Sequence, residues 1–140
     1  MRADETRGLL DTNILILWRL VDPEALPAEM AISAVTLAEL SAGVHLVSGA
    51  AVAERAKRLE VLQRVEHEFD PIPFGAEAAR AFGGLTAAVQ EIGRTPRRRT
   101  ADLMIAAVAA AEGLPLYTAN PQDFRGLGEF VDVIEVPRPV

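Results

Sequence analysis

The sequence predicts an α/β domain of three layers, in which helices cover both faces of a central, mainly parallel sheet of about five short strands. Short apolar segments alternate along the chain with longer segments whose apolar residues recur at helical spacing. The chain has 140 residues, half of them hydrophobic, which suits one folded domain. We therefore expect a single domain over residues 1–140, with residues 1–7 as a flexible extension.

In the first half of the chain, a short apolar run ends at Asp11, followed by Thr12 and Asn13, residue types that favour turns and helix N-caps. Apolar residues between Leu37 and Val47 lie on one helix face, and so do those of the charged segment that follows. We expect strands at residues 8–11 and 31–35, and helices at residues 14–21, 37–47 and 49–69.

In the second half, a segment with two prolines at residues 71–74 is expected to be a short or peripheral strand, because proline lacks the N–H that a sheet needs. Thr100 is expected to cap a nearly all-apolar helix that Gly113 and Pro115 end. The other expected elements are a helix at residues 78–92, a basic loop at 93–99, a helix at 101–112, strands at 114–118 and 131–136, and a turn at 120–124.

The composition excludes several classes of protein. The chain has no cysteine, which excludes a disulfide scaffold and a cysteine-ligated metal site. Fourteen basic and 20 acidic residues give a net charge of −6, which by itself argues against a nucleic-acid partner but does not say where the carboxylates lie. Residues 1–8 have no apolar signal segment, and no apolar run is long enough to span a membrane, so a cytoplasmic protein is expected.

Oxygen-bearing side chains are expected to meet at one edge of the sheet. In a right-handed strand–helix–strand unit, each strand ends at the edge where the next helix begins. Ligands bind outside that carboxyl edge in open α/β sheets. The side chains that the expected elements place there are Asp11, Glu39, Asp102, Thr118, Asn120 and Asp123.

Taken singly, these residues have ordinary explanations, such as a helix cap for Asp11, a helix-dipole contact for Asp102 and turn chemistry for Asp123. Their shared position favours a functional site instead. Clustered carboxylates repel one another and must hold protons or cations, and Mg²⁺ or Mn²⁺ suits oxygen ligands better than zinc does. His45 and His67 lack metal-ligand spacing, and no motif for a nucleophilic serine is present.

Four motifs occur in order along the chain: LLDTN at residues 9–13, TLAEL at 36–40, TADLMIAA at 100–107 and YTANPQDF at 117–124. With these motifs the chain resembles the PIN-domain family, and within it the VapC-type ribonuclease toxins of bacterial toxin–antitoxin pairs, over residues 8–136. The resemblance implies a PIN-like fold and a Mg²⁺- or Mn²⁺-dependent endoribonuclease that hydrolyses RNA phosphodiester bonds.

By this resemblance, Asp11, Glu39 and Asp102 correspond to the first three acids of the family. Asn120 stands where many members have an acid, and Asp123 also matches an acidic position, so the fourth ligand and the number of metal ions, one or two, stay open. The resemblance thus implies catalytic acids at Asp11, Glu39, Asp102 and Asp123, metal ligands at these four and Asn120, and supporting polar residues at Asn13 and Thr118.

The basic loop directly before Asp102 is either an ordinary solvated loop or a surface that contacts RNA phosphates. Its candidate residues are Arg94, Arg97, Arg98 and Arg99. The resemblance also implies a homodimer, neutralised by an antitoxin through which DNA is only an indirect partner. The alternative is a non-catalytic PIN-like module that binds RNA or protein and has lost strong metal affinity at Asn120.

Overall fold

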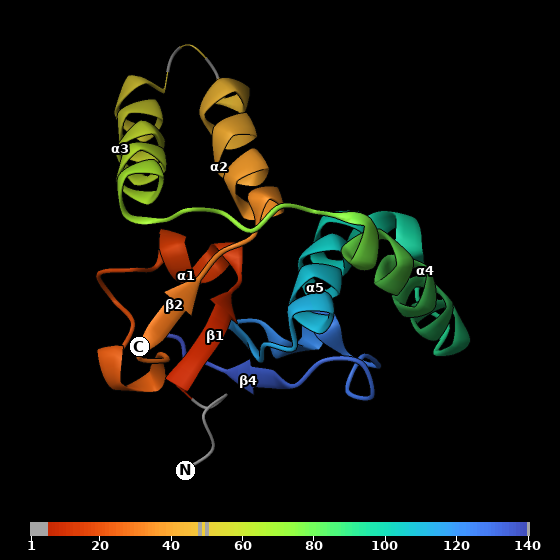
Figure 1. Ribbon diagram of the computed structural model, residues 1–140. Coiled ribbons are helices and arrows are strands. Elements are labelled where there is room, and N and C mark those ends of the chain that lie inside the picture. The colour runs from red at the N-terminus through yellow and green to blue at the C-terminus, as the bar shows by residue number, and fades with distance from the viewer. Residues whose placement is uncertain (1–5, 48, 50, 140) are drawn as a thin grey trace.

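The computed structural model of the protein describes residues 6–47, 49 and 51–139 and has the expected three layers. Four strands form one sheet in the order β2-β1-β3-β4 (Figure 1). All the pairings between them are parallel, so the four strands end at the same edge. The strands are β1 (Arg7–Leu10), β2 (Glu29–Ala31), β3 (Leu116–Thr118) and β4 (Val133–Glu135).

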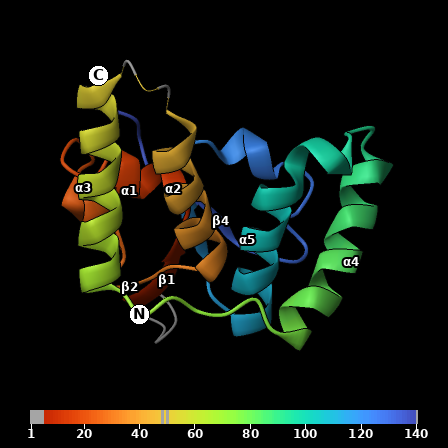
Figure 2. The same ribbon diagram turned by 90° about the horizontal axis from the view of Figure 1, so that it is seen from above.

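Helices cover both faces of this sheet. Leu9 and Leu116 belong to the core on one face, while Leu10 and Tyr117 belong to the core on the other, because successive side chains alternate along a strand. Within the helical layers, α2 packs beside α3 and α4 beside α5 (Figure 2). The first face is covered by α4 (Ala76–Glu91) and α5 (Thr100–Glu112), and the second by α1 (Thr12–Ile16), α2 (Ala34–Leu46) and α3 (Val52–Glu68).

The central helix α5 is apolar on most of its circumference because it lies between the sheet and α4. Leu103 and every residue from Ile105 to Ala109 are buried. Gly113 ends the helix in the left-handed conformation, with φ at +67°, as the sequence predicted. The chain then enters β3, so the beginning of α5 lies at the edge where the strands end.

Of the five expected strands, the one at residues 71–74 is wrong. This segment forms only an isolated bridge between Ser33 and Ile72, in which the Ile72 N–H donates to the Ile32 carbonyl at 2.9 Å and the Ala34 N–H donates to the Ile72 carbonyl at 2.8 Å. Pro71 and the proline at position 73 flank Ile72 and have no N–H to donate, so the pairing cannot extend.

Several expected boundaries are also wrong. β2 ends at Ala31, not residue 35, because the Ser33 hydroxyl caps α2 by accepting from the Thr36 N–H at 3.2 Å. α1 begins at Thr12 and ends at Ile16, so it both starts and ends earlier than the helix expected at residues 14–21. Thr100 does not cap α5: it is the first helical residue, and its hydroxyl donates to the Arg97 carbonyl at 3.0 Å.

At the beginning of the chain, the extension expected at residues 1–7 falls mostly on residues 1–5, which lie outside the described residues, while β1 begins at Arg7. In the part of the chain that the structure describes, no helix combines the length and the apolar character that crossing a membrane requires.

Gly8 allows β1 to pass beneath a buried side chain of β3. A Cβ at this position would overlap the Tyr117 ring. We expect Gly8→Ala to lower the free energy of unfolding by about 1–3 kcal/mol, the usual cost of overpacking a core, in urea denaturation. Gly83→Ala, in open space on α4, is the matched control and should raise that free energy by about 0.5–1 kcal/mol. Equal effects of the two substitutions would contradict the prediction.

Candidate functional site

Asp11 lies where β1 ends and α1 begins, at the carboxyl edge of the sheet. Its Oδ1 accepts a hydrogen bond from the Thr12 backbone N–H at 2.8 Å, which caps α1, and its Oδ2 accepts one from the Thr118 hydroxyl at 2.8 Å. Only 4% of Asp11 is exposed. The helix cap and the candidate site residue are therefore the same carboxylate, held from two sides.

Glu39 lies in the second turn of α2, one turn later than expected, because the helix begins earlier than the pattern suggested. Its Oε1 accepts a hydrogen bond from the Thr12 hydroxyl at 2.6 Å, and this hydroxyl also lies 3.0 Å from that of the buried Thr36. Thr12 thereby joins α2 to the end of β1. The motifs do not predict this role, although Thr12 directly follows Asp11 in the first of them.

Asp102 and Asp123 share an arginine. Asp102 is in the first turn of α5, and Asp123 is in η4 (Pro121–Phe124), a short 3₁₀ helix after β3. The Arg99 Nη1 donates to the Asp123 Oδ1 at 2.9 Å and lies 3.9 Å from the Asp102 Oδ2. Arg99 therefore belongs to the acidic cluster as well as to the basic loop that precedes it.

The buried Thr118 connects the end of β3 to the start of α1. Besides donating to Asp11, its hydroxyl accepts from the Asn120 N–H at 3.0 Å and from the Asn13 Nδ2 at 3.4 Å. The Asn13 Oδ1 accepts in turn from the Ala119 N–H at 3.2 Å. Asn13 and Thr118 thus lie beside Asp11 and fix its surroundings.

The Asn120 side chain faces the C-terminal segment. Its Oδ1 accepts from the Arg138 guanidinium, at 3.2 Å from Nε and 2.5 Å from Nη2. No sequence signal predicts this role for Arg138, because it lies in an irregular segment after the last strand and has no local motif. The contact between Arg138 and Asn120 depends on how the segment after β4 passes the end of β3.

The acids at this edge act on one another electrostatically. Burial, and after it the negative charges of Asp11, Asp123 and Glu39, raise the pKa of Asp102 to about 7, and Arg99 opposes them. Burial likewise raises the pKa of Asp11 to about 6, against two hydrogen bonds that favour its carboxylate. The negative charges of Glu39 and Asp123 therefore act on both Asp11 and Asp102, and Arg99 does not balance them at Asp102.

This donor set suits a hard divalent cation. All its ligand atoms are oxygens of carboxylates or an amide, which Mg²⁺ and Mn²⁺ select, and the excess negative charge favours binding a cation. As placed among the described residues, no three acidic or histidine side chains form a group ready to hold one ion. Sharing one ion therefore requires the carboxylates to move closer together than they lie here.

The basic loop forms a rim next to the acids. Its last four residues form the 3₁₀ helix η3 (Pro96–Arg99) that leads into α5. The Arg94 Nη1 donates to the Gln122 carbonyl at 2.7 Å, which joins the loop to η4, and Arg97 is exposed. The side chain of Arg98 lies outside what the structure describes.

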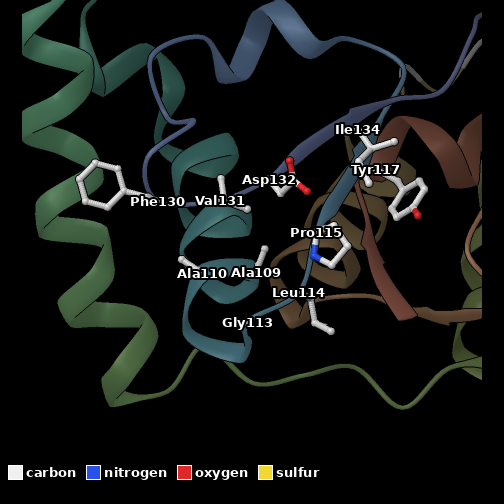
Figure 3. Close-up of a pocket in the computed structure, with 10 residues that line it drawn as sticks. All are labelled: Ala109, Ala110, Gly113, Leu114, Pro115, Tyr117, Phe130, Val131, Asp132 and Ile134. Atoms are coloured by element: carbon white, nitrogen blue, oxygen red, sulfur yellow. The ribbon is translucent and has the colours of Figure 1, made fainter. Parts of the chain in front are cut away.

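Two pockets differ in their relation to these residues. A groove of about 450 Å³ between α1, α2 and α3 is lined by Thr12 and Glu39 together with apolar residues such as Ile16 and Leu40. A second pocket, of about 270 Å³, lies between the end of α5 and the strands β3 and β4 (Figure 3). Its lining includes Asp132 but none of the candidate site residues. The groove therefore adjoins the acidic edge at Glu39, and a further pocket of about 300 Å³, lined by Asn120 and Asp123 among others, adjoins the same edge at η4.

The fold and the site together define an α/β domain with an acidic site at the carboxyl edge of a parallel sheet. The chain belongs to the PIN domain family, whose model matches residues 8–129. It is 37% identical to Ribonuclease VapC5 of Mycobacterium tuberculosis, over 97% of this chain and 100% of that protein.

Solved structures are similar over nearly the whole chain. The VapBC-5 structure of the VapBC family of toxin–antitoxin systems, from Mycobacterium tuberculosis, matches with a TM-score of 0.81 and 36% identity, covering 94% of this chain and 99% of that chain. A toxin–antitoxin complex from Klebsiella pneumoniae matches with a TM-score of 0.62 and 27% identity, over 95% of this chain and 99% of that one.

The raised pKa of Asp102 predicts how the metal-free protein responds to pH. A carboxyl whose folded pKa lies above its unfolded value binds its proton more tightly in the folded state, so stability is lost as pH rises from about 4 to 7. Asp102→Asn removes this charge. In EDTA we expect the variant to unfold about 4 °C or more above the wild type at pH 8, and with a much smaller difference at pH 4.5.

Asp132→Asn, which removes an exposed carboxylate away from the site, is the control for that measurement and should show no such pH-dependent gain. A wild-type protein more stable than the Asp102 variant at pH 8 in EDTA would contradict the electrostatic argument.

Proposed function

We propose that this protein is a cytoplasmic Mg²⁺- or Mn²⁺-dependent endoribonuclease, acting as the toxin of a toxin–antitoxin pair. The observation on which the proposal rests is the meeting of four carboxylates, from four separate segments, at one edge of the sheet with too little positive charge to balance them. The similarity to a protein named a ribonuclease and to structures of toxin–antitoxin complexes supports the substrate class and the partner.

In this proposal Asp11, Glu39 and Asp102 hold the cation, and Asp123 and Asn120 are the candidates for a further ligand. A bound Mg²⁺ or Mn²⁺ supplies Lewis acidity at the phosphate and lowers the pKa of water to a range where it becomes a nucleophile. The protein orients these ligands. One oxygen of Asp11 is fixed by a backbone N–H and the other by Thr118, which leaves lone pairs on both for a ligand.

The threonines and Asn13 act as positioning residues. Thr12 fixes an oxygen of Glu39, and Thr118 fixes an oxygen of Asp11, so each of these two acids has one oxygen oriented by a threonine. Asn13 bonds both to Thr118 and to the backbone after β3. Preorganised ligands of this kind need less rearrangement when the cation and the phosphate bind.

The arginine loop is proposed to bind the RNA backbone. Arg94, Arg97 and Arg98 belong to the loop that leads into α5, whose first turn carries Asp102, and phosphate groups that approach the cation would pass beside this loop. Arginine pairs with phosphate through charge-assisted hydrogen bonds that fix position without reading sequence. This local basic rim is compatible with a chain whose net charge is −6.

The proposed protein partner is an antitoxin, and the toxin itself is proposed to be a homodimer. The groove beside Glu39 is lined by an exposed apolar side chain, Ile16, which is 61% exposed. A partner segment that filled this groove would lie against the acidic edge and hinder RNA from reaching it. DNA would then be bound only through the antitoxin.

Asp11→Asn is the sharpest test of this activity. Asparagine is as good a helix N-cap as aspartate, so the fold should survive, but the carboxylate charge is lost. We expect cleavage of a mixed RNA substrate at saturating Mn²⁺ to fall at least about 100-fold, with an unchanged far-UV circular dichroism spectrum. EDTA should abolish cleavage by the wild type, and added Mn²⁺ should restore it.

Asp132→Asn serves as the charge-matched control and should cleave normally. Full activity of the Asp11 variant would contradict the proposed site. Calorimetry separates the alternative of a non-catalytic module: negligible binding of Mn²⁺ by the wild type would favour that module over the nuclease.

Arg97→Glu combined with Arg98→Glu tests the RNA-binding loop. Losing two phosphate contacts should raise the RNA concentration at half-maximal rate about tenfold or more and reduce the slope of log affinity against log salt by about two. Titration of single-stranded RNA at 50–200 mM salt measures both quantities. Unchanged affinity and salt dependence would mean that the loop is only solvated.

A further inference from the structure

Arg99 points into the acidic site. It is the residue directly before α5, and its Nη1 is shared between the Asp123 Oδ1 at 2.9 Å and the Asp102 Oδ2 at 3.9 Å. Its side chain is 31% exposed, against 32% for Asp123 and 25% for Asp102, so the three groups are about equally withdrawn from solvent. The guanidinium thus occupies the space between two of the four acids.

The second candidate ligand on this side of the site is also held by an arginine. The Asn120 Oδ1 accepts from both Nε and Nη2 of Arg138. Asn120 is a neutral side chain, so it adds an oxygen but no negative charge to attract a cation. The half of the site formed by Asp123 and Asn120 is therefore supplied with positive charge by the chain itself.

In the other half of the site, Lys57 and Arg58 line the groove beside Glu39, but among the described residues no cation forms an ion pair with Asp11 or Glu39. The hydrogen bonds to Asp11 and Glu39 come from threonine hydroxyls and one backbone N–H, all of them neutral donors. Neutral donors fix the oxygens without cancelling their charge. The site is consequently asymmetric, with uncompensated carboxylates on one side and an arginine-paired carboxylate on the other.

From this asymmetry we infer that the site takes a single divalent cation, on the side of Asp11 and Glu39, and that Arg99 supplies the second positive charge at Asp123 and Asp102. The inference rests on the proposed metal-dependent nuclease and decides its number of ions. Arginine suits this role because its charge persists at every physiological pH. A guanidinium has five N–H donors, and both contacts to the acids use Nη1, so other donors can meet a phosphate oxygen.

The number of bound ions tests this role directly. Metal-free full-length protein is titrated with Mn²⁺ by calorimetry at pH 7.5, and the bound ions are examined by electron paramagnetic resonance, which detects the coupling of two adjacent Mn²⁺ ions. We expect one ion per chain in the wild type and in Arg99→Lys, which keeps the charge. Arg99→Gln should bind two coupled ions, because it releases Asp123 and removes the positive charge beside Asp102. Arg80→Gln, an exposed arginine on α4, is the charge-matched control and should bind one.

Cleavage provides a second measurement. The rate should depend on Mn²⁺ concentration with a slope near one on logarithmic axes in the wild type, and with a slope approaching two in Arg99→Gln. Two ions in the wild type, or one ion in a folded Arg99→Gln, would overturn the inference and leave the proposed nuclease intact. If Arg99→Gln fails to fold, the number of ions bound by the wild type still tests the inference. Absence of both Mn²⁺ binding and cleavage in the wild type would instead reject the proposed function itself, and the inference with it.

Discussion

The hydrogen bond between the Thr118 hydroxyl and the Asp11 carboxylate is the contact on which the geometry of this edge depends. It joins two residues that are 107 positions apart in the chain and lie at the ends of two neighbouring strands. The backbone beneath it is paired as well, since the Asp11 N–H donates to the Tyr117 carbonyl at 2.8 Å. Because the second oxygen of Asp11 caps α1, one buried carboxylate sets the positions of β1, β3 and α1 together. The other candidate residues are placed relative to this junction.

Holding an acid in this way has an energetic consequence. The burial that fixes Asp11 and Asp102 also raises their pKa values to about 6 and about 7, so their charged forms weaken the folded state at neutral pH. The apolar cores on both faces of the sheet offset that cost, and α5 contributes most because nearly all its middle turns are buried. The edge is thus strained electrostatically rather than in its backbone, where positive φ angles among the described residues occur only at glycines.

The sequence was sufficient for features that depend on local pattern, and insufficient for those that depend on distant contacts. The three-layer fold follows from alternating apolar spacings, and the meeting of Asp11 and Asp102 at one edge follows from parallel topology. The pairing of Asp123 with an arginine and of Asn120 with Arg138 has no local signal, because each depends on where two separate segments end. Thr100 shows the limit of propensity: it is a good cap residue, but the 3₁₀ turn before it already continues into α5. The strand expected at residues 71–74 does not form, although here the local signal was sufficient. Its two prolines cannot donate the hydrogen bonds of a sheet, and the segment forms only an isolated bridge.

An acidic chain that binds RNA needs positive charge in the right place rather than in total. The net charge of −6 is an average over the whole surface, whereas a phosphate group near the carboxyl edge meets mainly the charges within about 10 Å of it. At that range the acids are faced by Arg99, by the basic loop of η3 and, in the proposed function, by a divalent cation. Each carboxylate that binds a cation or an arginine ceases to repel phosphate. In the proposed function the acids therefore localise the positive charge that an RNA substrate requires, whereas a more basic chain would also attract RNA to the rest of its surface.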